Sequence, residues 1–297
     1  MAQRATMSAG RSPQETMALL ARETRWRHGA VPTALDGIEV APGHRLFAKG
    51  QFLLRCDSGN AYHYIPGEGV TIARPERADP DEEQLWLNGS VYAAIACLNG
   101  LYPFHASAVA YEGQVFAFTG PSGAGKSTLV AGLGQRGLPL FCDDTMLLDL
   151  SDPDLIIALP GHKQLKLADP ALALTGARAL APVGSDTGKS YACPPAGTVA
   201  DPLPLACLTF LEAAPVCQLE RLAGAQRLLR LDDDHYTQQF FLDVWRPTRE
   251  HLFALRSRLA RQLAMAVFKR PVRAEAFAKS LDLAEGSIRN FSNGDRA

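Results

Sequence analysis

The sequence has no apolar run that approaches the ~18–20 residues needed to span a membrane. Its N-terminal segment, residues 1–27, carries five arginines but no apolar core of the kind found in a secretory signal. We therefore expect a cytoplasmic protein that makes no use of a membrane.

Cysteine is scarce, and charge of neither sign is in excess. The six cysteines are scattered, and no Cys-x-x-Cys or Cys/His pair has the spacing of a metal site, so we expect reduced, mostly buried thiols. Lys and Arg number 30 against 31 Asp and Glu, which leaves no net field to attract nucleic acid. The run Asp232–His235 is more typical of a solvated turn than of a cation site.

What remains is an ordinary globular composition, 47% hydrophobic and 21% charged, in 297 residues. The distribution of turn residues, β-prone runs and helical periodicity changes along the chain and predicts three parts. Residues 1–34 form a flexible or helical segment, residues 35–83 a small β-rich subdomain of hairpins, and residues 84–297 a larger α/β domain that ends in helices.

Hydrophobic periodicity predicts the main elements. Helices are expected over residues 14–27, 84–99, 129–135 and 248–268, and strands over 105–110, 114–119, 138–142 and 206–211. The segments 1–14, 183–195 and 282–297 are polar and are expected to be exposed or loosely held.

One motif carries specific chemistry. Gly120-x-x-x-x-Gly125-Lys126-Ser127 follows an apolar strand and opens a helix, which is the pattern of a phosphate-binding P-loop. Its glycines let backbone amides approach phosphate oxygens, Lys126 reaches the β- and γ-phosphates, and Ser127 is a ligand for Mg²⁺. The expected nucleotide-binding residues are Gly120, Pro121, Ser122, Gly123, Ala124, Gly125, Lys126, Ser127 and Thr128.

Phosphoryl transfer also needs a carboxylate for the metal ion and a group that orients or deprotonates the acceptor. Asp143 and Asp144 end the first strand after the P-loop helix, where ligand sites of α/β sheets form. His105 begins the strand pair before the loop. On position alone, the aspartates also fit a turn and the histidine a structural role, and Lys163, Lys166, Lys189 and Glu212 are weaker candidates for the site.

Together these residues resemble the kinase domain of the HPr kinase/phosphorylase family. The resemblance rests on His105-Ala-Ser-Ala-Val, the P-loop from Gly120 to Thr128, Arg136-Gly137 and Asp143-Asp144, and more weakly on Pro160-Gly161-His162-Lys163. It covers roughly residues 100–215. It implies an α/β fold with the compact mixed sheet that this family shares with phosphoenolpyruvate carboxykinases.

The resemblance also implies roles for individual residues. Asp144 becomes the candidate base, Asp143 its metal or water partner, and His105 a group near the phosphates, although the division between the two aspartates stays open. Self-association into homo-oligomers is implied as well.

The chain departs from bifunctional HPr kinases, because the glycine-rich signature that follows their acidic pair and their larger N-terminal domain are both missing. It is more similar to divergent members that modify peptides, such as lasso-peptide precursor kinases.

The leading hypothesis is a Mg²⁺- and ATP-dependent kinase that phosphorylates a serine hydroxyl of a protein or peptide. A small-molecule hydroxyl kinase and a non-catalytic ATP-binding regulator are the alternatives. The sequence leaves open the acceptor, the choice between ATP and GTP, the reversibility of the reaction and the oligomeric state.

Overall fold

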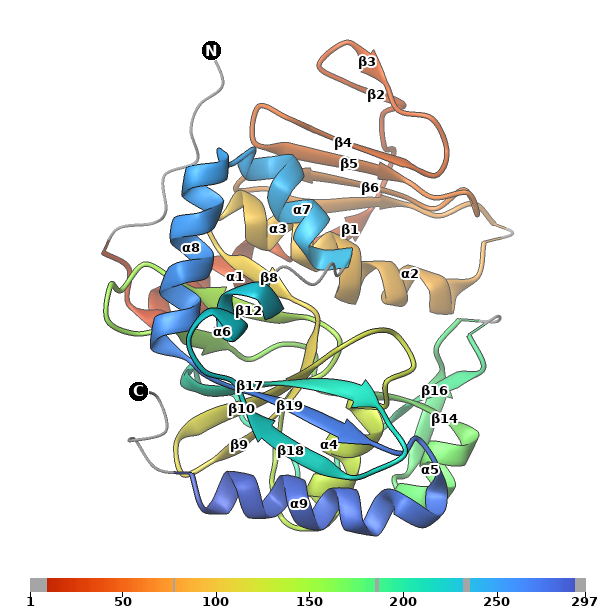
Figure 1. Cartoon of the computed structure of the whole chain (residues 1–297). Coiled ribbons are helices and arrows are strands. Elements are labelled where there is room, and N and C mark those ends of the chain that lie inside the picture. The colour runs from red at the N-terminus through yellow and green to blue at the C-terminus, as the bar shows by residue number, and fades with distance from the viewer. Residues whose placement is uncertain (1–9, 77, 185–186, 232–235, 292–297) are drawn as a thin grey trace.

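The structure is a computed structural model that describes residues 10–76, 78–184, 187–231 and 236–291. It is a mixed α/β protein with a nine-stranded sheet, a separate five-stranded sheet and helices around both (Figure 1). The run Asp232–His235 lies outside the described residues. Over the part that is described, no helix is long and apolar enough to cross a membrane.

The nine-stranded sheet is mixed, as the sequence predicts. β10 pairs with β17 and β17 with β19 in parallel, and the other neighbours are antiparallel. The tight β9–β10 turn places Glu112 and Gly113 at positive φ, which explains the expected break between the two apolar runs. The strands are β8 (Tyr102–Phe104), β9 (Ala106–Tyr111), β10 (Gln114–Thr119), β11 (Leu140–Cys142), β12 (Met146–Asp149), β13 (Ile157–Leu159), β17 (Leu203–Ala213), β18 (Gln218–Arg221) and β19 (Ala264–Arg270).

The five-stranded sheet contains the hairpins expected in the N-terminal third, and lies at the top of Figure 1. Its order is β1-β7-β6-β5-β4, so β1 is an edge strand. The strands are β1 (Trp26–His28), β4 (His44–Ala48), β5 (Gln51–Arg55), β6 (Ala61–Ile65) and β7 (Gly69–Ala73), and a small hairpin of β2 (Ala34–Leu35) and β3 (Ile38–Glu39) stands beside them. The expected N-terminal helix is α1 (Pro13–Glu23), which begins with a capping box of Ser12 and Glu15.

One long helical stretch lies between the two sheets (Figure 1). It runs through α2 (Pro80–Trp86), a π-helical turn η1 (Leu87–Val91) and α3 (Tyr92–Leu98), so the predicted helix begins earlier than residue 84. Ile95 of α3 belongs to an apolar cluster that also contains Phe52 and Tyr62 of the five-stranded sheet and Phe104 of β8. The domain boundaries expected from the sequence stay a prediction, and a single core crosses the one at residue 83.

The remaining elements cover the nine-stranded sheet and its margins. α4 (Lys126–Gln135) and α9 (Phe277–Arg289) pack together beneath it, with Leu129, Leu133 and Leu281 in one buried cluster (Figure 1). The others are α5 (Asp169–Thr175), α6 (Ala225–Arg230), α7 (Tyr236–Trp245), α8 (Arg249–Gln262), the 3₁₀ turn η2 (Ala274–Ala276) and a three-stranded sheet of β14 (Leu165–Ala168), β15 (Ala179–Pro182) and β16 (Lys189–Ala192).

Three expectations about single segments are wrong. The helix over 248–268 ends at Gln262, and Ala264–Arg270 is a buried strand because it pairs in parallel with β17. The segment 282–297 is not wholly loose, because α9 reaches Arg289 and buries Ala284 and Ile288. The polar stretch 183–195 contains β16, which is held by antiparallel pairing with β14.

Candidate functional site

The glycine-rich loop joins β10 to the first turn of α4. Gly125 caps the helix in the left-handed conformation, with φ 81°, and Gly120 stands at φ 142°. A Cβ on Gly120 would lie 2.9 Å from the carbonyl oxygen of Leu211, so the loop needs glycine there for close packing as well. The unpaired N–H groups and positive dipole end of α4 therefore face the concavity of the loop, an arrangement suited to anions.

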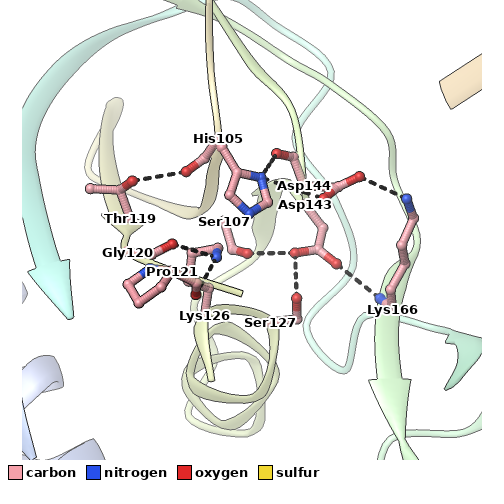
Figure 2. Close-up of polar contacts among 10 residues, drawn as sticks. All are labelled: His105, Ser107, Thr119, Gly120, Pro121, Lys126, Ser127, Asp143, Asp144 and Lys166. Carbon is pink, nitrogen blue, oxygen red and sulfur yellow. Dashed lines mark hydrogen bonds and ion pairs between the residues drawn. The ribbon is translucent and has the colours of Figure 1, made fainter. Parts of the chain in front are cut away.

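Lys126 is the first residue of α4, and its side chain turns back over the loop. Its ammonium donates hydrogen bonds to the carbonyl oxygens of Gly120 at 2.8 Å and Pro121 at 3.1 Å (Figure 2). The residue is only 7% exposed. Burial lowers the pKa of Lys126, while the nearby charges of Asp143 and Asp144 raise it.

Asp143 ties the loop helix to the neighbouring strands. Its Oδ1 accepts hydrogen bonds from the hydroxyls of Ser107 at 2.5 Å and Ser127 at 2.8 Å, and its Oδ2 accepts the backbone N–H of Lys166 at 2.9 Å (Figure 2). Asp143 is 1% exposed. The serine of the loop and the first aspartate of the acidic pair are thus in direct contact.

A sharp backbone turn directs Asp144 away from Asp143. The N–H of Thr145 donates to the carbonyl of Asp143 two residues earlier, at 3.0 Å, and Asp144 between them has φ 73°. A non-glycine residue with this φ is strained by roughly 1–3 kcal/mol, and such residues concentrate at functional sites. The turn sends the two carboxylates to different partners at the carboxyl end of β11.

Asp144 is held between a lysine and a histidine. Its Oδ2 accepts from the ammonium of Lys166 at 2.8 Å, and its Oδ1 lies 3.5 Å from Nδ1 of His105 (Figure 2). Although burial opposes ionisation, the ammonium of Lys166 lowers the pKa of Asp144 overall. The carboxylate is therefore ionised at neutral pH, and its side chain is 24% exposed.

His105 is neutral in this setting. Its Nδ1 lies 2.8 Å from the backbone carbonyl of Asp144, which can only accept, so Nδ1 carries the proton and Nε2 is the basic nitrogen. Burial first, and then the charge of Lys126, lower the pKa of His105 below its ordinary value. The backbone carbonyl of His105 also accepts a hydrogen bond from the hydroxyl of Thr119, and this bond fixes the strand end beside the loop.

Arg270, the last residue of β19, anchors the loop from behind. Its guanidinium donates to the carbonyls of Ala124 at 2.8 Å and Gly125 at 3.1 Å. A Cβ on Gly125 would lie 2.4 Å from the same nitrogen, so glycine is also required for this contact. Arg270 is 4% exposed, and burial lowers its pKa.

Of the four weaker candidates from the sequence, the structure brings only one, Lys166, into the described site. Lys166 joins the site through Asp144, whereas Lys163 turns away and donates to the carbonyls of Phe141 and Val199. Glu212 pairs with Arg230 at 2.5 Å at the end of β17, and Lys189 is exposed at the start of β16.

Pro121, Ser122 and Gly123 form the exposed crest of the loop. Ala124 and Thr128 are partly buried on either side of its helix start.

Sequence reasoning missed the roles of Ser107 and Arg270, and it named Lys166 only as a weaker candidate. Ser107 had a usable signal, because residues two apart on a strand share a face and His105 precedes it by two. Lys166 and Arg270 reach the site from β14 and β19, and nothing local in their sequences marks that contact.

The oxygen donors suit Mg²⁺ in a limited way. Ser127 Oγ and Asp143 Oδ1 are hard ligands 2.8 Å apart, and within the described residues no cluster of three or more acidic, histidine or cysteine side chains is formed for a metal. Mg²⁺ commonly takes one or two protein ligands and fills its shell with water and phosphate, so this pair fits that ion.

No protein-family model and no curated protein matches this chain. Among solved structures, the Hpr(Ser) kinase/phosphatase from Coxiella burnetii is similar at 14% sequence identity, with a TM-score of 0.32 over 63% of this chain and 94% of that one.

Proposed function

We propose that this protein is a kinase that transfers the γ-phosphate of ATP to a serine hydroxyl of a protein or peptide. The observation that carries the proposal is the 2.8 Å hydrogen bond between Ser127 and Asp143, with the ionised Asp144 next in the chain. It supports the proposal because the glycine-rich loop and the acidic pair lie together, and phosphoryl transfer requires a phosphate-binding group beside a carboxylate.

In this proposal the loop holds the donor. Backbone N–H groups at the start of α4 bind the phosphates, and the ammonium of Lys126 moves from the carbonyls of Gly120 and Pro121 to the β- and γ-phosphates. Ser127 and Asp143 would hold Mg²⁺, which neutralises phosphate charge when it is bound. Arg270 keeps the loop in the shape that presents its amides.

Asp144 orients the acceptor and receives its proton. The serine oxygen forms a bond to the γ-phosphorus as the bond from that phosphorus to the bridging oxygen breaks, and ADP leaves. The hydroxyl proton passes to Asp144. Lys166 makes this carboxylate a weak base, which suits a loose transition state in which the nucleophile keeps its proton until late.

The test uses γ-labelled ATP with Mg²⁺ and a set of serine-containing peptides. We expect transfer by the wild type, loss of nucleotide binding in Lys126→Ala, and loss of transfer with retained nucleotide binding in Asp144→Asn. Lys279→Ala, which changes an exposed lysine of α9, is the matched control. Transfer at the wild-type rate by Asp144→Asn would remove Asp144 from the mechanism, and label accepted only by metabolites would identify a small-molecule kinase.

A further inference from the structure

A recess of about 290 Å³ opens at the surface, with Gly161 and His162 in its lining. Its walls come from three distant parts of the chain: the start of β1, the α2–η1–α3 helix and the loop after β13. Its lining includes the side chains of Trp26, Gln84, Asn88, Tyr92 and His162. No residue of this recess has a part in the donor site described above.

Two side chains, His162 and Tyr191, link the wall of the recess to Lys166. The ring of His162 lies 5.6 Å from that of Tyr191, and Tyr191 stands opposite Lys166 in the β14–β16 register. Lys166 in turn holds Asp144 at 2.8 Å. Gly161 completes the connection, since a Cβ there would lie 2.6 Å from the carbonyl oxygen of Thr145, directly after the acidic pair.

The lining is suited to a polypeptide. Gln84 and Asn88 offer amide groups that both donate and accept, as the backbone of a peptide does, and Trp26 is 46% exposed and offers an aromatic face. Burial lowers the pKa of His162, so the imidazole adds no positive charge at neutral pH. The helix wall here is η1, and π-helical turns are frequent at functional sites.

A second recess of about 370 Å³ lies on the far side of Trp26 and is bounded by Arg25, Arg27 and Glu68. Among the described residues, Arg27 forms an exposed ion pair with Glu68 at 3.3 Å, which contributes little to stability. Both recesses have Trp26, on the edge strand β1, in their lining, and the second adds two arginines. Two recesses that meet at one residue offer an extended chain more contacts than a compact metabolite could make.

We infer that this surface binds the acceptor as an extended peptide, with the serine at Asp144, the chain across Trp26 and a carboxylate near Arg25 and Arg27. The inference rests on the proposed function and names its substrate class more closely. It makes Trp26 and Asn88 determinants of peptide affinity, and it makes the two arginines determinants of selectivity for acidic peptides.

The experiment uses synthetic decapeptides with one serine each, in which an acidic pair is moved along the chain or omitted, and each is made with a free and an amidated C-terminus. Transfer from γ-labelled ATP is measured as a function of peptide concentration. We expect Trp26→Ala and Asn88→Leu each to raise the KM for peptide by about tenfold, which corresponds to about 1.4 kcal/mol. Ile38→Ala and Phe253→Ala, exposed apolar residues outside the surface, are the controls and should leave this KM unchanged.

The double variant Arg25→Ala/Arg27→Ala tests whether the two arginines select acidic peptides. It should lose the preference for acidic over neutral peptides, and dependence on amidation would show that the carboxylate is the chain terminus and not a side chain. If peptides are phosphorylated but Trp26→Ala, Asn88→Leu and the arginine variant all keep wild-type KM and selectivity, the inference is overturned and the kinase proposal stands. If wild type labels no peptide, although it binds ATP, both are overturned.

Discussion

Asp143 and Asp144 are neighbours in the chain, but their surroundings differ. Asp143 is enclosed and accepts three hydrogen bonds, from Ser107, Ser127 and the backbone of Lys166. Asp144 is partly exposed and faces Lys166 and His105. The enclosed carboxylate holds the loop, and in the proposed mechanism it also binds the cation while the exposed one meets the acceptor.

This difference predicts separable defects. Asp143→Asn should destabilise the fold by about 1–3 kcal/mol, because an amide cannot accept all three hydrogen bonds, and it should raise the Mg²⁺ concentration needed for half-maximal activity. Asp144→Asn should lower kcat by roughly 10²–10⁴-fold with little change in the Mg²⁺ requirement. Urea unfolding and Mg²⁺ titrations of both variants check this, and identical Mg²⁺ curves for both would contradict the assigned division.

His105 gives a pH prediction with a definite sign. Its pKa in the folded protein lies below the ordinary value of 6.5, so between that value and the lower folded pKa the unfolded chain binds more protons. The stability contributed by neutral His105 is therefore present above pH 6.5 and is lost as the pH falls towards the folded pKa.

The free energy of unfolding of wild type should accordingly drop more between pH 7 and pH 5 than that of His105→Asn, whose amide can replace the Nδ1–H donor. His251→Asn, at an exposed position on α8, is the control and should follow wild type. Other titrating groups are common to all three proteins and cancel in the comparison. Parallel curves for wild type and His105→Asn would contradict the neutral, buried state of this histidine.

At the scale of elements, the packing of α4 on α9 depends on a helix glycine. A Cβ on Gly132 would lie 2.7 Å from both Leu281 Cδ2 and Phe277 Cζ. Overpacking a buried contact costs about 1–3 kcal/mol, which exceeds the ~1 kcal/mol that alanine gains over glycine in a helix. Gly132→Ala should therefore destabilise the protein by about 1 kcal/mol.

Gly286→Ala is its matched control, because a Cβ there meets nothing within 4 Å in α9. It should stabilise the protein by about 0.5–1 kcal/mol through helix propensity alone. Chemical denaturation of the two variants measures the difference. A stabilising Gly132→Ala would show that α4 and α9 are further apart than the structure places them.

Elements with a strong local signal were predictable, and those decided by distant pairing were not. The N-terminal hairpins and the β10–loop–α4 unit follow from alternation, turn residues and the glycine motif, whereas the mixed sheet was implied by the family resemblance. The segment after Gln262 carries apolar residues in continuation of the helical spacing of α8, and only its pairing with β17 makes it a strand.

The same limit applies to the site. His105 before one strand, Lys126 and Ser127 at the start of a helix and Asp143 after the next strand follow an order that allowed their proximity to be expected. The contacts of Lys166 and Arg270 depend on where β14 and β19 come to lie.

At the scale of the whole molecule, a ligand that binds only the folded state stabilises it by RT ln(1 + [L]/Kd). With Mg²⁺ and ATP at about 100 times Kd, the gain should be about 2.7 kcal/mol and should raise the unfolding temperature. Lys126→Ala should abolish this rise, and Lys279→Ala should retain it. Thermal unfolding followed by circular dichroism, with AMP as the comparison nucleotide, checks the prediction, and an equal shift with AMP would argue against triphosphate recognition.

The contact of Arg270 with the loop has a consequence for biosynthesis. Arg270 donates a hydrogen bond to the carbonyl of Ala124, which precedes it by 146 residues in the chain. Arg270 is the last residue of β19, and β19 pairs with β17. A ribosome releases the loop long before this arginine emerges. If the loop binds nucleotide as proposed, we expect newborn chains to gain that affinity only after β19 has emerged and paired with β17.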